Sequence, residues 1–300
     1  MIYDDTVKSL AVYLSMVQFL PYGRIAKLFM EVFGLRISQG SIANWIALAR
    51  KNAQPAIAAI MREIRKSSIV GFDESGFYCN KKLDWAWIAQ TVYFTVLFRG
   101  DGRGAKELEG RFGDSLERMV AVTDRHSAYF AVNFLGHQVC LAHLLRDLQY
   151  LDGLDGKQDW SRKVGELLRE SIHERNQHPK ERIDKKPWLE RLDTLLKQYV
   201  DRLGDDFRRM RAGLRKCRDY LFNFLENPLV PPDNNASERG IRKLKIKMKN
   251  ACTFRSEWGA DAFLEIHSIV ETAKKHGRSS YDVIRCLFHP TDKVAMAFAE

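Results

Sequence analysis

Residues 68–98, SIVGFDESGFYCNKKLDWAWIAQTVYFTVLF, alternate runs of β-branched and aromatic residues with polar turn residues. The runs cover residues 69–72, 85–88 and 92–98, and this composition is typical of strands. We therefore expect three strands joined by hairpins, with the first turn near residues 79–82. The second strand is expected to pass quickly into the third.

The sequence that follows this stretch predicts two further strands. A short helix is expected near residues 105–112, and the apolar run 119–122 leads to Asp124. A helix near 127–134 and a strand around 137–142 complete the order βββαβαβ. Because a helical crossover joins parallel strands, the fourth strand should lie parallel to an earlier one. The predicted fold class is therefore α/β, with a mixed five-stranded sheet and flanking helices.

Helical patterns precede the strands. Apolar residues recur at helical spacing through residues 1–66, which we expect to form an N-terminal helical region. Gly34 should end its second helix, and Ser38 or Ser41 should cap its third. This outline is shared by helix-turn-helix motifs and by helical hairpins that only pack, and both readings stay open.

The rest of the chain continues the core and interrupts it. We assign residues 67–143 to the first part of the core and 144–230 to a helical insertion rich in charges of both signs. Residues 231–300 form a C-terminal helical part, in which Asn234, Asn235 and Ser237 offer caps for a helix. The insertion thus lies before the last helix of the predicted site.

Three acids occupy positions that suit a shared metal site. Asp73 ends the apolar part of the first strand, Asp124 ends the fourth, and Glu238 lies in the first turn of a later helix. Neighbouring parallel strands can bring two such acids together, and a helix across the sheet can add the third. Clustered carboxylates need a dication, and their oxygens suit Mg²⁺ or Mn²⁺. Two such ions fit phosphoryl transfer.

Each acid also has an ordinary structural explanation. Aspartates commonly end strands, and a glutamate near a helix N-terminus is favoured by the macrodipole. Taken singly, each structural reading is the more common one, whereas the combination favours a site. Glu74, beside Asp73, should point to the other face of the strand. His126 and His143 either help to position DNA or serve a local turn and helix start.

The charge balance favours a polyanionic partner. The 300 residues carry a formal net charge of +10, and nucleic acid is the leading candidate because Lys and Arg displace counterions from phosphates. A dense run of cations without acids follows Glu238, and we interpret it as a DNA-contacting surface. Its members are Arg239, Arg242, Lys243, Lys245, Lys247 and Lys249. A merely solvated basic helix face is the alternative.

Cysteine usage and hydropathy narrow the remaining classes. Five scattered cysteines without a CxxC pattern suggest reduced thiols. Cys140 and His143 have metal-ligand spacing, but no second pair supports a zinc site. No stretch approaches the roughly 18 apolar residues of a membrane span, so we expect a cytoplasmic protein without a membrane partner. Trp85 and Trp87 share one side of a strand and should pack in the sheet rather than stack on bases.

Four motifs carry a resemblance to a known family. They are GFDES at 71–75, TDRHSAY at 123–129, CLAHLLRDL at 140–148 and PPDNNASERGIRKLK at 231–245. With them, the chain resembles bacterial transposases of the insertion sequence 66 family. The resemblance implies an RNase H-like core and a DDE triad formed by Asp73, Asp124 and Glu238. It also implies divalent metal, strand transfer of insertion-sequence ends into target DNA, and a homo-oligomer on nucleoid DNA.

Two departures from the family pattern bear on function. Arg125 stands where the family often has glycine, and the amino-terminal extension of full-length relatives, with its DNA-binding and zinc-binding regions, precedes the part that this chain resembles. The chain is therefore expected to be either a truncated copy or a catalytic fragment. The alternatives to a DDE transposase are a structure-selective RNase H-like nuclease and a non-catalytic DNA-binding remnant that regulates transposition.

Overall fold

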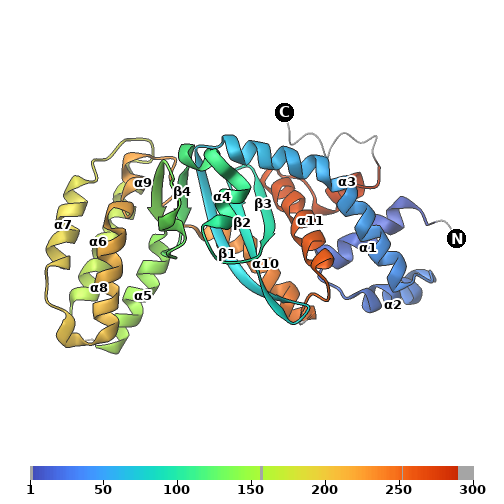
Figure 1. Ribbon diagram of the computed structural model, residues 1–300, viewed down its shortest axis with the longest axis horizontal. Helices are drawn as coiled ribbons and strands as arrows, with labels where there is room; N and C mark the ends of the chain where they lie inside the picture. Colours follow the sequence, from blue (N-terminus) through green and yellow to red (C-terminus); the bar gives the residue numbers. More distant parts are fainter. Residues whose placement is uncertain (1–2, 156–157, 252, 290–300) are drawn as a thin grey trace. The chain divides into compact units, whose positions relative to one another are not determined.

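The computed structural model describes residues 3–155, 158–251 and 253–289, and it divides the chain into two compact units. The first unit takes in Met1–Ser67, Phe72–Arg111 and Ala236–Glu300, and the second takes in Ser68–Gly71 and Phe112–Asn235. The second unit therefore includes the predicted helical insertion together with two strands. The first unit joins the N-terminal and C-terminal helices to the hairpin strands (Figure 1).

One mixed sheet of five strands runs through the fold in the order β3-β2-β1-β4-β5. The strands are β1 (Ile69–Cys79), β2 (Lys82–Gln90), β3 (Thr95–Gly100), β4 (Val120–Thr123) and β5 (Gly136–Val139). The pair β2 and β3 is antiparallel, whereas β4 lies parallel to both β1 and β5. The predicted α/β class with a mixed five-stranded sheet is confirmed, and the arrangement is consistent with an RNase H-like fold.

The helices begin and end as follows. In the first unit they are α1 (Asp5–Met16), α2 (Tyr22–Phe33), α3 (Gln39–Lys66), α4 (Lys106–Phe112), α10 (Asn235–Ala251), α11 (Glu257–Lys275) and α12 (Ser280–Cys286), of which α4 and α10 each have one end residue in the second unit. In the second unit they are α5 (Leu141–Leu154), α6 (Trp160–Gln177), α7 (Lys186–Leu196), α8 (Asp205–Cys217) and α9 (Asn223–Glu226).

Three expected element bounds differ from the structure. Instead of a helix over 127–134, there is a single 3-10 turn, Tyr129–Ala131. Residues 92–94 belong to the turn before β3, because the Thr91 hydroxyl accepts hydrogen bonds from the amides of Tyr93 and Phe94. The last strand is shorter than expected, since α5 already begins at Leu141.

Helix α11 closes the open edge of the sheet at β3 (Figure 1). The hydroxyl of Ser268 accepts a hydrogen bond from the amide of Leu97 at 2.8 Å, and the hydroxyl of Thr272 accepts one from the amide of Thr95 at 3.0 Å. Both hydroxyls also donate to the carbonyls of the same two residues. Because an unpaired strand edge invites association with other strands, two hydroxyls one helical turn apart take the place of a further strand.

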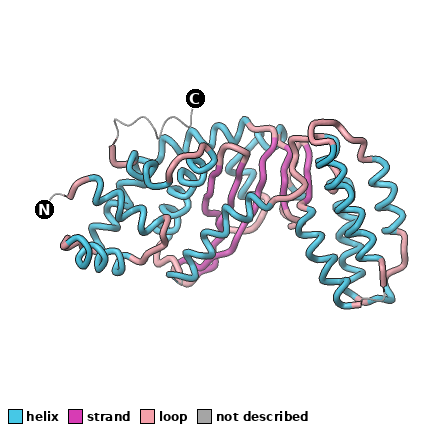
Figure 2. The backbone as a smooth tube through the Cα atoms, turned by 180° about the vertical axis from the view of Figure 1, so that it is seen from behind, coloured by secondary structure: helices cyan, strands magenta, loops and turns pink. Residues whose placement is uncertain are grey.

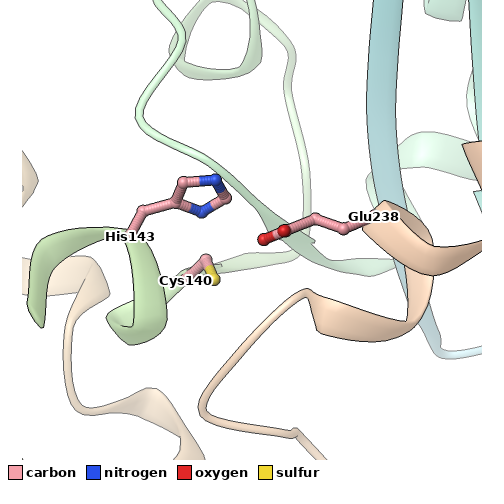
Figure 3. Close-up of side chains that lie close together, drawn as sticks. All are labelled: Cys140, His143 and Glu238. Atoms are coloured by element: carbon pink, nitrogen blue, oxygen red, sulfur yellow. The ribbon is translucent and has the colours of Figure 1, made fainter. Parts of the chain in front are cut away.

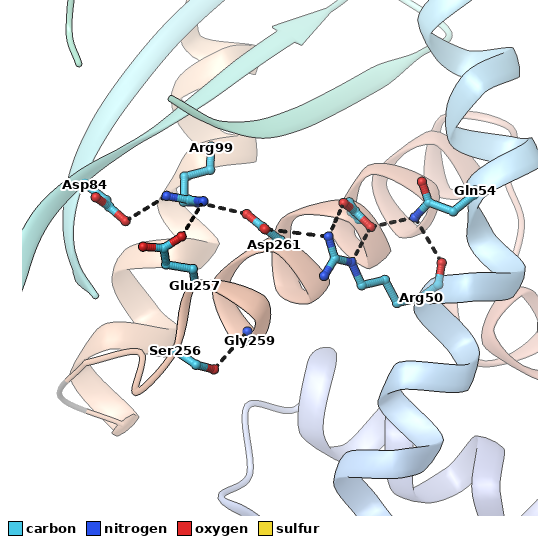
Figure 4. Close-up of polar contacts among 9 residues, drawn as sticks. Arg50, Gln54, Asp84, Arg99, Ser256, Glu257, Gly259 and Asp261 are labelled. Atoms are coloured by element: carbon cyan, nitrogen blue, oxygen red, sulfur yellow. Dashed lines mark hydrogen bonds and ion pairs between the residues drawn. The ribbon is translucent and has the colours of Figure 1, made fainter. Parts of the chain in front are cut away.

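Charged side chains tie the same strand to helices α3 and α11 (Figure 4). The guanidinium of Arg99 on β3 contacts Asp84, Glu257 and Asp261. The guanidinium of Arg50 on α3 makes a bidentate contact with Glu265 at 2.8 and 2.9 Å. Such fork-to-carboxylate contacts fix geometry as well as charge, so they align α11 along both of its neighbours.

The second unit has its own apolar core, built from the strand residues Val122 and Val139 and the inner faces of α5 to α9. The tube view in Figure 2 shows these helices side by side. The guanidinium of Arg175 is buried in this unit and donates to four backbone carbonyls. The buried charge is thereby satisfied by hydrogen bonds to the backbone.

Two expectations from composition can be compared with the described residues. Cys79, Cys140, Cys217 and Cys286 are buried and are not in disulfides, whereas Cys252 lies outside the described residues. Among the helices that the structure describes, none combines the length and apolar character needed to cross a bilayer.

Replacing the edge hydroxyl tests the role of α11. Thr272→Val should lower the free energy of unfolding by about 1–3 kcal/mol, because the buried Thr95 amide loses its acceptor. Thr272→Ser keeps the hydroxyl, so its free energy of unfolding should fall by clearly less. Urea denaturation followed by circular dichroism measures both, and equal losses in the two variants would contradict the edge-closing role.

Candidate active site

Asp73 lies on β1, the central strand of the sheet. Its side chain is half-buried, and its Oδ1 accepts a hydrogen bond from the Glu74 amide at 2.9 Å. Glu74 points the other way, as predicted: its side chain is 0% exposed and its carboxylate accepts from Arg103 at 2.6 Å. The two adjacent acids therefore differ in their surroundings, one inside an ion pair and one at a more open position.

The β1–β2 hairpin fixes which residues share the face of Asp73. Its turn contains only Asn80 and Lys81, so Cys79 pairs with Lys82 across the hairpin. Continued along both strands, this register places Asp73 opposite Ile88. A Cβ built on Gly76 would lie 3.7 Å from the ring of Trp85, as the same register requires.

Helix α10 packs on the face that carries Asp73 and Ile88. A Cβ built on Gly240 would lie only 2.4 Å from Cδ1 of Ile88, so the helix backbone rests directly on β2. One turn earlier, the Ser237 hydroxyl accepts a hydrogen bond from Gln90 Nε2 at 3.1 Å. The first turn of α10, which carries Glu238, therefore lies on the same face of the sheet as Asp73.

Gln90 is held in place by a second buried contact. The ammonium of Lys275 donates to Gln90 Oε1 at 2.8 Å and to the carbonyls of Thr91 and Phe94 at 2.6 and 3.1 Å. Because an ammonium group only donates, it fixes the amide with its NH₂ group toward Ser237. Burial lowers the pKa of Lys275 to about 8.

Asp124 follows β4 in the second unit. In the register of β1 and β4, Gly71 pairs with Val122, and Asp73 and Asp124 each stand two residues beyond that pair in the sequence. Asp124 is half-buried, and its Oδ1 accepts from the amide of His126 at 2.8 Å. This local hydrogen bond gives His126 a role in the turn.

Hydrogen bonds hold the loop that contains Asp124. The Thr123 hydroxyl donates to the Asp124 carbonyl at 2.7 Å and contacts His137 Nε2 at 2.7 Å. Burial lowers the pKa of His137 to about 4, so the ring is neutral at pH 7 and donates to Thr123. Arg125 turns away into the helical part of the unit, where it pairs with Asp147 and contacts Met210.

Cys140 and His143 stand at the start of α5 in the second unit. Figure 3 shows both side chains there, and labels Glu238 on α10. Cys140 precedes the helix, and its Sγ accepts a hydrogen bond from the Asn234 amide at 3.1 Å. Burial raises the pKa of the Cys140 thiol.

The predicted DNA-contacting cations divide into two sets. Exposed positions on α10 are held by Arg239, Arg242, Lys245 and Lys249. Lys243 instead forms an ion pair with Glu271 on α11, and Lys247 donates to the Ser15 carbonyl at 3.4 Å. Burial also lowers the pKa of Lys247. The last two side chains therefore face neighbouring helices of their own unit.

Glu238 shares a stripe of α10 with three of the exposed cations. Arg242, Lys245 and Lys249 follow it at intervals of 4, 7 and 11 residues, which is the spacing of one helix face. A cationic track thus begins one turn from the carboxylate. The charge density along the sequence indicated the surface, but only helical periodicity separates its outward and inward members.

Comparison with known proteins identifies a family whose profile matches the chain. The sequence profile described as "Transposase IS66 family" matches residues 1–262 of the 300. No curated protein matches the chain.

The contact of Gly240 with Ile88 can be tested by a double-mutant cycle. Gly240→Ala should lower the free energy of unfolding by about 1–3 kcal/mol, because its methyl group collides with Ile88 Cδ1. Ile88→Val removes that atom, so the double variant should lose less than the sum of the two single losses. Gly110→Ala, whose new Cβ meets nothing within 4 Å, is the helical control. Additive losses would contradict the packing of α10 on β2.

Proposed function

The chain belongs to the transposase IS66 family, and from that premise we propose that it is a DDE transposase. In this proposal it cleaves DNA at insertion-sequence ends and joins the ends to target DNA. Asp73, Asp124 and Glu238 are the proposed catalytic carboxylates. We further propose that it acts in the bacterial cytoplasm on nucleoid DNA, as a homo-oligomer that holds two ends.

The observation that carries the proposal is the placement of these acids on the sheet. Asp73 on β1 and Asp124 directly after β4 each stand two residues beyond Gly71 and Val122, which pair in parallel. Glu238 reaches the face of Asp73 because Ser237 and Gly240 contact β2 on either side of it. If the two aspartates only ended strands, nothing would require them to stand at matching positions.

We propose that the three acids hold two Mg²⁺ or Mn²⁺ ions. All three candidate ligands are carboxylates, which are the hard oxygen donors that these ions prefer. Such ions, when bound, supply a Lewis acid to the attacking and leaving oxygens of an in-line displacement at phosphorus. The chain's own part is to carry Asp124 in a hydrogen-bonded loop and Glu238 on a helix packed against the sheet.

In this proposal the DNA runs along α10, in contact with the cationic stripe. Arg242, Lys245 and Lys249 would bind successive phosphates of the strand whose scissile phosphate lies at Glu238. Because these contacts go to the backbone, they hold any sequence equally. Recognition of particular ends must therefore come from other contacts.

Substitution of the three acids tests the catalytic proposal. Asp73→Asn, Asp124→Asn and Glu238→Gln should each lower the rate of cleavage and strand transfer by at least about a hundredfold, since each removes a charged ligand. Labelled element-end DNA with Mg²⁺ or Mn²⁺ is the substrate. The controls are the exposed acids Asp114→Asn and Glu109→Gln, which should keep full activity.

Two results would contradict that proposal. Variants of all three acids that retain the activity of the Asp114→Asn control would remove them from the chemistry. A wild-type chain that binds element-end DNA but makes no product with either ion would instead be a DNA-binding remnant.

Removal of the outward cations tests the DNA path. Arg242→Gln, Lys245→Gln and Lys249→Gln should each reduce the slope of log affinity against log salt by about 0.9 for duplex DNA. Lys51→Gln, at an exposed site on α3, should leave the slope unchanged. Lys243→Gln should mainly destabilise the fold, because it removes one of the two cations that pair with Glu271, whose side chain is only 14% exposed. Fluorescence anisotropy at increasing salt concentration measures these slopes. Unchanged slopes in all three variants would contradict the proposed DNA path along α10.

A further inference from the structure

The tip of the β1–β2 hairpin holds a lysine in an unfavourable conformation. Asn80 and Lys81 have φ values of 47° and 65°, the left-handed region. Two-residue turns of this kind favour Asn followed by Gly, because residues with a Cβ rarely adopt it. Glycine would relax Lys81, and the lysine instead places an exposed ammonium at the tip. Strain of this sort marks positions where the side chain has a use.

The face of the hairpin away from Asp73 carries an open aromatic surface. The register of the hairpin pairs Tyr78 with Leu83, and these two side chains are 57% and 52% exposed. Next along the strands, Gly76 stands opposite Trp85 and leaves the indole half-exposed. The guanidinium of Arg103 lies 5.2 Å from the centre of the Trp85 ring. Tyr78, Leu83 and Trp85 thus form one apolar strip bordered by a cation.

The charges around this strip are positive. Lys81 and Lys82 are exposed at the tip. Exposed Arg255 directly follows Phe254, which pairs with Cys79 and accepts from the Asn80 amide at 2.8 Å. Of the acids on the two strands, Glu74 pairs with Arg103 and Asp84 pairs with Arg99, whereas Asp73 lies on the other face. The surface therefore complements a polyanion that also offers flat apolar groups.

We propose that Tyr78, Lys81, Lys82, Leu83 and Trp85, here called the hairpin platform, bind unpaired nucleotides of a DNA strand. A base would stack on Tyr78 and pack against Leu83 while the lysines contact phosphates, a combination of aromatic stacking and cations that is typical of single-strand binding. A duplex cannot use this surface, because its bases are already stacked inside. The proposal rests on the proposed function in one respect, namely that the strand bound here is the DNA on which the chain acts.

The position of the platform on β1 sets its distance from the proposed catalytic residue Asp73. Tyr78 is five residues from Asp73 on one strand, about 17 Å at 3.4 Å per residue. Because five is odd, the two side chains point to opposite faces of the sheet. The platform is thus suited to a strand that leaves the cleaved end and passes around the hairpin, apart from the duplex along α10.

Binding of labelled oligonucleotides to the full chain tests the stacking contact. Tyr78→Ala should weaken binding of a single-stranded oligonucleotide by roughly fivefold or more, with little change for a blunt duplex. Tyr199→Ala removes a tyrosine that is 68% exposed in the second unit and should change neither. A Tyr78→Ala variant that binds single strands as the Tyr199→Ala variant does would overturn the proposal.

Substitutions of Lys81 should weaken the binding of single-stranded DNA without lowering the stability of the fold. Lys81→Gly relieves the left-handed strain, so the melting temperature should stay level or rise, whereas the salt slope for single-stranded DNA should fall by about 0.7. Lys81→Asn, which also tolerates this conformation, should behave alike. Wild-type salt dependence in both variants would overturn the role of the charge.

Two further outcomes separate this proposal from its rivals. If Tyr78→Ala lowers the oligomer size in light scattering and leaves single-strand binding unchanged, the platform is an interface between copies of the chain and the proposal fails. If the wild type binds single strands through Tyr78 but never cleaves element ends, the proposed catalysis fails while the platform stands.

Discussion

The backbone hydrogen bonds of β1 are the constraint on which the rest of the structure depends. Its first residues pair with β4, and it is also hydrogen-bonded to β2, so both of its edges are used. A slip of one residue would send every side chain to the opposite face. The hairpin register therefore decides that Asp73 lies under α10 while Glu74 is buried against Arg103.

Local signals allowed much of this arrangement to be predicted from the sequence. The two-residue turn between β1 and β2 falls within the predicted 79–82. Gly34 ends α2 in the left-handed conformation, and Ser38 caps α3 by accepting from the Ser41 amide. Each of these signals acts within four residues, and at each site the local preference agrees with the fold. The position of Asp73 at the end of an apolar run could be predicted because such runs have clear ends in the sequence.

The features that sequence reasoning missed depend on contacts between distant segments. The apolar pattern of 127–134 suggested a helix, yet only a 3-10 turn forms, because Phe130 and Phe134 pack around the buried ring of His137. Ser268 and Thr272 stand one turn apart on an otherwise apolar face of α11, and that spacing was a readable sign of a polar partner. Its identity, the edge of β3, was not readable, since about 170 residues separate them.

The two faces of the β1–β2 ribbon explain why neighbouring residues in one strand have unlike tasks. Toward α10 the ribbon is covered: Ile88 is fully buried, and Phe77 packs against Phe254. Covering removes water and fixes side chains, which suits a carboxylate that must keep one position. The other face is covered by the loop before α4 only as far as Trp85, and Gly76 marks where the cover stops. Beyond it Tyr78 is 57% exposed, so one strand can carry Asp73 on its covered face and an accessible surface at its far end.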